Sequence, residues 1–461
     1  MARQPTSPNQ PPSPAEAERG TVLIVTMLVL ALLAMGVGSY LSLNLNTARQ
    51  ARHTYHSTAS FHLAEAGAEE AVWSLNQGRS PEAWRDWTIR RPAAWRRFTG
   101  FDLGGGATGY VKVYVSDTNP AAGSKPLAVA EATVVSPGLP PSTRMLELTL
   151  GRRSYFANGI VARDSVKFAG RNVSIDSWNS DPDNDPGTAP VPYSAGVRND
   201  RGSVATNAVE NNAMLVNQAN VWGYVATGGG APEVGVNGSV RGADTPAGVQ
   251  IDPARVSTDF ASDLPVLSAP VDGTPIVTVG ATLGLAGQTT KWRCQSIRLN
   301  GRDTLTILGN VILVLTNTVG SALEITGNAS LIIPDGSSLT IYAEADIKIA
   351  GNGLANANSR PASCLIYGTG SDRSGQTIQI AGNGALKAAV YAPNAALQVN
   401  GNGDVMGSLV GREVAFNGEA SFHYDESLAE PAEDTPFKVT RWRELTAASD
   451  RARWQSVFSG W

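Results

Sequence analysis

Two groups of acidic side chains have residue types and spacings that could do chemistry. Asp181, Asp183 and Asp185 alternate along one segment, and alternating carboxylates can bind a hard cation such as Ca²⁺. The segment lacks the downstream glycine and glutamate of a helix–loop–helix calcium site, so a solvated acidic loop is the simpler interpretation. The sequence therefore predicts no cofactor and no metal centre, with these three residues as a weak Ca²⁺ candidate.

The second acidic group lies on the run 341–349. Alternation along a strand would place Glu344, Asp346 and Lys348 on one face. Two carboxylates roughly 5–10 Å apart could hydrolyse a glycosidic bond. Neighbouring charges on the solvent face of any strand give the same pattern, however, and no further acid or histidine joins them from the nearby sequence. We therefore interpret Glu344, Asp346 and Lys348 as the solvent-exposed face of a strand.

Other catalytic motifs are missing from the sequence. Three of the four histidines lie within residues 53–62, at spacings that do not match a metal-binding helix, and His423 lies near the end of the β-rich region. Residues 104–109 match G-x-G-x-x-G by letter, but the strand-like run follows the glycines instead of preceding them. No P-loop or G-x-S-x-G is present. We expect a protein that is not an enzyme.

Composition points to a turn-rich β protein. Only 16% of the 461 residues are charged, while glycine (48) and proline (27) are abundant. The net charge of −4 argues against a nucleic-acid partner, which would need a clustered basic face. Cys294 and Cys364 are too few for a disulfide scaffold, and we interpret them as two unrelated buried thiols.

One segment must meet a membrane. Between Arg19 and Arg49 the chain has 29 residues without a charge, and Thr21–Leu43 is dominated by aliphatic side chains. About 20 such residues in a helix cross a hydrocarbon core of about 30 Å. The residues expected to contact lipid or neighbouring helices are Val22, Leu23, Ile24, Leu28, Leu32, Gly36, Gly38 and Leu41. The sequence stays helix-compatible to Asn76, so we expect one helix of about 55 residues.

Two β regions follow this helix. Three alternating runs, Tyr110–Ser116, Leu127–Val135 and Arg144–Leu150, predict a small antiparallel sheet beside the helix. Farther on, Gly-Asn pairs recur next to short alternating runs. They lie at Gly309 and Asn310, Gly327 and Asn328, Gly351 and Asn352, Gly382 and Asn383, and Gly401 and Asn402. A strand followed by a Gly-Asn turn at a near-constant interval is typical of one coil of a β-solenoid, and we expect a right-handed parallel β-helix or a similar solenoid.

The N-terminal sequence Arg19-Gly-Thr-Val-Leu-Ile-Val-Thr-Met, together with Leu63-Ala-Glu-Ala-Gly, resembles the N-terminal region of PilX-type minor pilins and pilus-assembly proteins. This resemblance covers about an eighth of the chain. It implies an inner-membrane helix with its N-terminus in the cytoplasm, and processing between Gly20 and Thr21. Major pilins carry a glutamate five residues after the cleavage glycine, where this chain has Val25. Residues 389–395, 403–411 and 422–428 resemble an uncharacterised β-solenoid tail attached to such N-termini.

Together these features predict a mainly β protein with a long N-terminal transmembrane helix, a small pilin-like α+β head and a C-terminal parallel β-helix. The expected segments are a disordered leader (1–18), a transmembrane and continuing helix (19–78), the head (79–154), the solenoid (155–428) and a C-terminal tail (429–461).

We expect a structural or adhesive component of a type IV pilus or pseudopilus in the bacterial inner membrane, with most of the chain outside. Its partners would be the membrane and pilin-like subunits or pilus assembly machinery. The alternative is a membrane-anchored β-helix that binds or cleaves polysaccharide, with surface glycans as partners.

Overall fold

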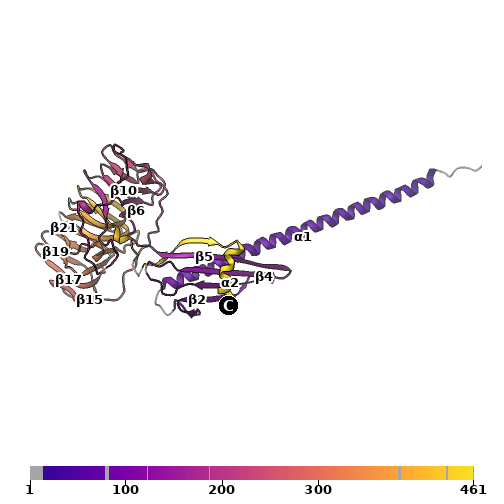
Figure 1. The fold of residues 1–461 in the computed structure, drawn as a ribbon, viewed down its shortest axis with the longest axis horizontal. Coiled ribbons are helices and arrows are strands. Elements are labelled where there is room, and N and C mark those ends of the chain that lie inside the picture. Colours follow the sequence, from indigo (N-terminus) through magenta and orange to yellow (C-terminus); the bar gives the residue numbers. More distant parts are fainter. Residues whose placement is uncertain are drawn as a thin grey trace, which may run out of the picture. The chain divides into compact units, whose positions relative to one another are not determined.

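The structure, a computed structural model, describes residues 14–77, 82–121, 123–185, 187–351, 353–382, 386–431 and 435–459. The chain is mainly β with one long apolar helix near its N-terminus, as the sequence predicts (Figure 1). It divides into two compact units, of which the first contains residues 1–151 and 437–461 and the second contains residues 152–436. Residues 437–461, expected as part of a tail, therefore belong to the first unit.

Helix α1 spans Pro14–Asn76, so residues 14–18 of the expected leader are helical. Every side chain from Val22 to Tyr55 is exposed, and packing begins at His56. From there, small or apolar side chains recur every three or four residues and are buried against the sheet: Ala64, Ala68, Ala71 and Leu75.

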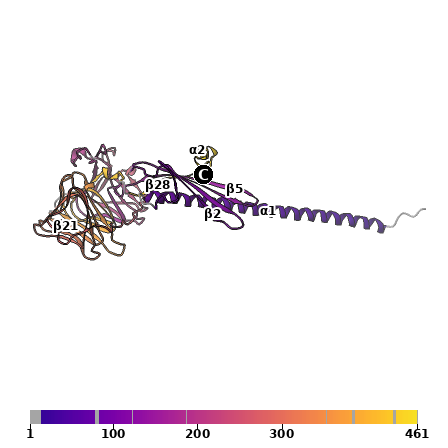
Figure 2. The same ribbon diagram turned by 90° about the horizontal axis from the view of Figure 1, so that it is seen from below.

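The first unit is built on one sheet with the strand order β1-β2-β3-β4-β5-β28. The strands are β1 (Thr88–Arg90), β2 (Ala93–Asp102), β3 (Thr108–Val115), β4 (Leu127–Ser136), β5 (Leu139–Arg152) and β28 (Phe437–Glu444). Neighbours from β1 to β5 are antiparallel, and β3, β4 and β5 confirm the three predicted strands. Figure 2 shows α1 running beside this sheet. Gly67 permits the close approach, because a Cβ there would lie 2.6 Å from Val111 Cγ1.

The C-terminal residues complete this unit. Strand β28 pairs with β5, and helix α2 (Ala448–Phe458) buries Trp454 and Phe458 with Val129 and Met145 in a second apolar cluster. Alternation turns these β4 and β5 side chains away from the α1 side. The sheet therefore lies between the two helices.

A pair of hydrogen bonds ties the end of α1 to the start of β28. The Asn76 side-chain amide donates to the Phe437 carbonyl (3.0 Å), and the Phe437 N–H donates to Asn76 Oδ1 (2.6 Å). These bonds thus join the end of α1 to the point where the chain returns to the first unit.

The second unit contains strands β6–β27 and four short 3₁₀ helices in its described part. The strands are β6 (Ile160–Phe168), β7 (Ser174–Trp178), β8 (Gly202–Thr206), β9 (Met214–Asn217), β10 (Asn220–Thr227), β11 (Glu233–Val234), β12 (Ser239–Arg241), β13 (Val256–Ser257), β14 (Thr274–Pro275), β15 (Thr282–Cys294), β16 (Ile297–Leu299), β17 (Thr304–Leu315), β18 (Ser321–Ile325), β19 (Ser330–Ile333), β20 (Ser338–Ala343), β21 (Asp346–Gly351), β22 (Leu354–Asn356), β23 (Cys364–Gly368), β24 (Thr377–Gly382), β25 (Leu386–Val399), β26 (Val405–Phe416) and β27 (Phe422–Asp425). The 3₁₀ helices are Ala195–Val197, Pro253–Arg255, Pro361–Ser363 and Glu426–Ala429.

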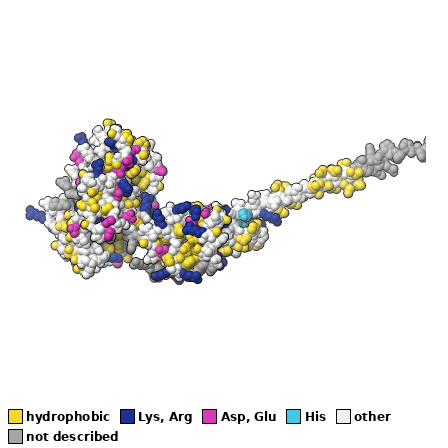
Figure 3. Space-filling model, viewed as in Figure 1, with side chains coloured by type: hydrophobic (Ala, Val, Ile, Leu, Met, Phe, Trp, Pro, Cys, Tyr) yellow, Lys and Arg dark blue, Asp and Glu magenta, His cyan; other side chains and the backbone are white. Residues whose placement is uncertain are grey.

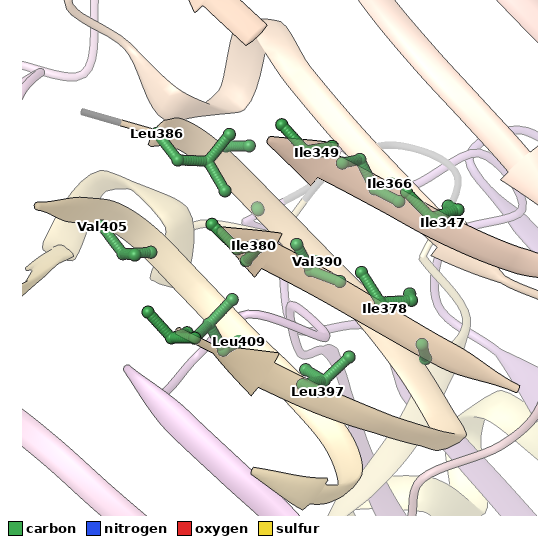
Figure 4. Close-up of a cluster of buried hydrophobic side chains, with 14 of the residues drawn as sticks. Ile347, Ile349, Ile366, Ile378, Ile380, Leu386, Val390, Leu397, Val405 and Leu409 are labelled. Atoms are coloured by element: carbon green, nitrogen blue, oxygen red, sulfur yellow. The ribbon is translucent and has the colours of Figure 1, made fainter. Parts of the chain in front are cut away.

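These strands pair in parallel and form a stack of successive coils. One column of paired strands runs β14-β15-β17-β20-β23-β25-β26, and a second runs β16-β18-β21-β24-β25. In the coils that Figure 4 shows, alternate side chains such as Ile347, Ile349, Ile378 and Ile380 point inward, into one apolar core. No coil could bury this face alone, so neighbouring coils stabilise each other.

The coils do not stack in chain order. The last coils of the second half pair with the first coils of the first half: β26 pairs with β6, and β27 pairs with β7. From β6 the stack continues through β8 to β10 and β13. The chain thus enters in the middle of the stack, runs to one end, crosses to the other end through residues 258–273, and winds back to the middle.

The Gly-Asn turns form a corner of this stack. Gly309, Gly327 and Gly351 have φ of 70°, 69° and 68°, a left-handed conformation that glycine adopts without strain. A Cβ on Gly351 would lie only 1.8 Å from the carbonyl oxygen of Gly327 in the coil below. Glycine is therefore required for both the turn and the approach of successive coils.

The other predicted turn residues that the structure describes lie at strand ends or bends of the same stack. Gly382 ends β24 opposite Gly351, and Gly401 and Asn402 lie in the bend between β25 and β26. Asn310 Oδ1 accepts from Ser338 Oγ (2.8 Å) in the next coil, and the Asn328 N–H donates to the Gly301 carbonyl (2.8 Å). Asn352 and Asn383 lie outside the described residues.

Candidate functional site

The predicted membrane residues share one bare stretch of α1. Large apolar side chains from Val22 to Leu45 are 48–67% exposed, and a Cβ on Gly36 or Gly38 would meet nothing within 4 Å. Figure 3 shows these apolar side chains along the protruding helix. Among the described residues, α1 is the helix long and apolar enough to cross a membrane. Gly20 and Thr21, the predicted processing site, lie within α1.

The acidic loop is held by groups of the chain itself. Asp181 Oδ1 lies 3.2 Å from Arg360 Nη2, and Asp183 Oδ1 accepts from the Thr188 hydroxyl (3.0 Å). That hydroxyl lowers the pKa of Asp183. Asp185 Oδ1 accepts the Gly187 N–H (2.8 Å). In the part of the chain that the structure describes, no group of three acidic, histidine or cysteine residues could hold a metal ion, and these contacts are those of a turn.

The run around Asp346 behaves as an ordinary strand face. Asp346 Oδ1 accepts the backbone N–H of Thr377 (2.7 Å) from the next coil. Lys348 is in register with Glu324, which in turn lies opposite Arg298 at 3.9 Å. The charges alternate in sign from coil to coil, so they stabilise the stack from its surface.

A buried His–Asp pair was not predicted. His423 on β27 and Asp176 on β7 are 4% and 3% exposed, and Nδ1 and Oδ1 lie 2.5 Å apart. Tyr193 stacks on the imidazole with ring centroids 3.7 Å apart and donates its hydroxyl to Asp176 Oδ2 (2.8 Å). Burial raises the pKa of Tyr193, with its hydrogen bond to Asp176 adding to the shift.

This pair lies where the two halves of the stack meet. Asp176 and His423 are register partners across β7 and β27, although 247 residues separate them in the sequence. The stacked Tyr193 ring covers one face of the imidazole, and the buried pair joins the two halves of the stack. No local pattern could have predicted it, because the partners meet only through the order of the coils.

A column of tyrosines is the other feature that the sequence analysis missed. Tyr342, Tyr367 and Tyr391 occupy register positions on β20, β23 and β25, and the first two rings stack with centroids 5.0 Å apart. Their sequence spacings of 25 and 24 residues match the coil interval, so the signal was present in the sequence.

Tyr342 and Tyr367 of this column line a pocket of about 280 Å³. Tyr155, Phe156 and Leu365 extend the apolar wall, while Ser268, Ser427 and Glu430 supply polar groups. Tyr342 is half-buried, Tyr367 is 8% exposed, and Tyr391 is fully buried with its hydroxyl donating to the Pro265 carbonyl (2.7 Å). The pocket therefore combines flat aromatic surface with hydroxyl and carboxylate groups.

Comparison with known proteins identifies one similar region. Residues 298–431 match a family model described as a domain of unknown function (DUF7305). The match covers less than a third of the chain and includes the Gly-Asn coils of the second half of the stack. No curated protein and no solved structure matches the chain.

Proposed function

We propose that this protein is a membrane-anchored structural or adhesive component of a type IV pilus or pseudopilus-like assembly. The observation that carries the proposal is the division of α1. Residues from Val22 to Tyr55 are bare, while residues from His56 onward pack against the sheet of the first unit. A helix that is apolar and unpacked at one end can exchange lipid contacts for contacts with other helices.

The proposal also assigns a fold to each of the two units. The first unit would be a pilin-like head, which the long helix packed on an antiparallel sheet supports. The second unit would be a β-solenoid, which the parallel coils and the glycine corner support. In this proposal the helix lies in the bacterial inner membrane, the N-terminus is cytoplasmic, and both units are outside. The solenoid would be displayed, not catalytic, in agreement with the turn contacts of the acidic loop and the covered His423.

Purified surface filaments test the proposal. Mass spectrometry should detect this chain in filaments sheared from cells of its source, and N-terminal sequencing should begin at Thr21. A chain that is missing from filaments and keeps residues 1–20 would contradict a role as a filament subunit. A Gly20→Asp variant, which should block processing, provides the matched control.

A second candidate function is glycan binding by the second unit, and the tyrosine pocket favours it. Aromatic faces pack against the apolar face of a sugar ring, and nearby hydroxyl and carboxylate groups can bind its hydroxyls. The expected result is binding on a glycan array that Tyr342→Ala reduces about tenfold, the size expected for a contact worth about 1.4 kcal/mol. Tyr224→Ala, at an exposed tyrosine elsewhere in the unit, should leave binding unchanged. Glycan binding that is equal in both variants would contradict this use of the pocket.

A further inference from the structure

The first unit has an apolar groove of about 440 Å³ between α1 and β28. Its walls include three large side chains that remain about half-exposed: Trp73 (45%), Val439 (46%) and Trp442 (48%). Glu65 and Glu69 line the groove on the α1 side, two turns and one turn before Trp73, respectively. Clustered exposed apolar side chains of this kind mark an interaction surface.

A second part of the same helix lacks a partner. The bare stretch from Val22 to Tyr55 is 34 residues, or about 51 Å of helix, whereas a hydrocarbon core is about 30 Å thick. The run dominated by aliphatic side chains ends at Leu43, so residues 44–55 extend past the hydrocarbon when Val22–Leu43 spans it. We call residues 44–55 the stalk. It contains Arg49 and Arg52 and no acidic residue, and all its side chains are exposed.

The stalk and the groove are complementary in charge. An offset that places Arg49 beside Glu65 lays the stalk along residues 60–72, which include the acidic part of the groove wall. Arg49 and Arg52 project from one side of the stalk, and Glu65 and Glu69 project from one side of the groove wall. Tryptophan faces beside the acids would also favour arginine through cation–π contacts.

We propose that the groove binds the stalk of a second copy of this chain, with Arg49 of that copy meeting Glu65 and its Arg52 meeting Glu69. This inference rests on the proposed assembly function and names its contact. Both pairs require parallel helices offset by 16 or 17 residues, which is about 25 Å along the helix. Two copies at the same depth in the membrane cannot make this contact, so it forms only in a staggered assembly.

Charge reversal in the full-length protein tests the contact in sheared surface filaments, where copies can lie at different heights along the helix axis. Two copies with different tags are co-expressed and crosslinked with a short reagent that does not react with amines. One tag is then used to recover the complex, and the amount of the second copy that is recovered with it is measured. Both the groove variant Glu65→Arg/Glu69→Arg and the stalk variant Arg49→Glu/Arg52→Glu should lower recovery of the second copy about tenfold, because like charges now face each other. Mixing one groove variant with one stalk variant should restore recovery, since each reversed surface then meets its complement.

The mixed pair also shows that both variants fold. A matched control, Glu233→Arg/Asp244→Arg, makes the same charge change at two exposed acids of the second unit and should leave recovery at the wild-type level. Wild-type association that both reversals leave unchanged would overturn the stalk–groove contact while leaving assembly intact. Loss in each variant without restoration in the mixture would also overturn it. No association of wild-type copies would overturn the contact and the proposed assembly together.

Discussion

The two β regions of this protein hold their strands together by different means. In the first unit, the antiparallel sheet lies between α1 and α2, and side chains from both helices cover its faces. In the second unit, parallel coils cover each other, and their backbones approach so closely at the corners that a Cβ would strike a carbonyl oxygen. Side-chain packing can adjust to a substitution, whereas a backbone contact cannot. The stability of the first unit should therefore depend most on keeping each helix and strand. The stability of the second unit should be lowered even by a single added Cβ atom.

Removing the C-terminal residues should have the largest effect. Deletion of residues 437–461 takes away β28 and α2 and exposes Val129 and Met145, which are buried by α2. We expect the first unit to lose its protease resistance completely and the second unit to keep it. Limited proteolysis in detergent, with the fragments identified by mass, measures both. Deletion of residues 459–461 is the control, and equal resistance of both units after the long deletion would contradict the division.

Replacing three glycines of the stack by alanine, one at a time, should come next in size. The three variants separate the cost of a left-handed backbone conformation from the cost of a clash between the added Cβ and a neighbouring backbone. Gly351→Ala combines a φ of 68° with a 1.8 Å backbone contact and should cost at least about 3 kcal/mol of unfolding free energy. Gly170→Ala meets the Gly418 carbonyl oxygen at 1.8 Å and should cost somewhat less. Gly336→Ala has a φ of 74° in open space and should cost about 1–2 kcal/mol.

Chemical denaturation of the full-length variants measures these differences. Gly67→Ala in the first unit is the comparison, because its added Cβ would meet side-chain atoms of Val111 and Val113, which can shift. We expect a cost of about 1–3 kcal/mol there. A Gly67→Ala cost that exceeds the Gly351→Ala cost would reverse the distinction between the two regions.

A smaller effect should appear as pH dependence in the stack. Burial raises the pKa of Asp425 above 3.8, against hydrogen bonds from Ser180 that lower it. As pH rises from 3.8 through the raised pKa, the folded state binds more protons than the unfolded state, so the free energy of unfolding falls. Asp425→Asn should remove this fall, and Asp335→Asn, at an exposed carboxylate of the same unit, should keep it. A pH profile of unfolding that is identical in Asp425→Asn and wild type would refute this assignment.

The smallest effect concerns the two thiols, both of which belong to the stack. Burial raises the pKa of Cys364 to about 12 and that of Cys294 to about 11. The thiolate reacts, so native protein at pH 8 should label slowly with a maleimide, Cys294 before the fully buried Cys364. Rapid labelling should begin only when the stack unfolds, even where the first unit has already been disrupted. Fast native labelling of Cys364, or a disulfide on a non-reducing gel, would contradict this.

The sequence predicted the features that depend on local spacing. Uncharged length predicted the exposed apolar part of α1, alternation predicted β3, β4 and β5, and the Gly-Asn interval located the left-handed turns at Gly309, Gly327 and Gly351. Each of these depends on residues within one or two elements, where periodicity is informative.

The features that were not predicted depend on distant pairings. Leu409 is in register with Ile160, and Asp176 with His423, because the stack joins its two halves out of chain order. Phe437 pairs with Asn76 because the chain returns to the first unit after some 285 residues in the second. The run Phe437–Glu444 carries charges on both faces, so its alternation was too weak to indicate a strand. The order in which strands pair does not change the local pattern of apolar and polar residues. It is therefore known only from the structure.

The mid-stack entry of the chain has a mechanical consequence. The segments at residues 152–159 and 426–431 lead out of adjacent coils, and the Tyr424 hydroxyl donates to the Phe156 carbonyl (3.0 Å) between these two coils. A tensile load applied through both segments would fall on the β6–β26 and β7–β27 ladders, where many parallel hydrogen bonds share it. The terminal coils would carry no tension. The hydrogen bonds of these ladders would therefore be loaded together, in shear. The stack would not unfold one coil at a time from its ends.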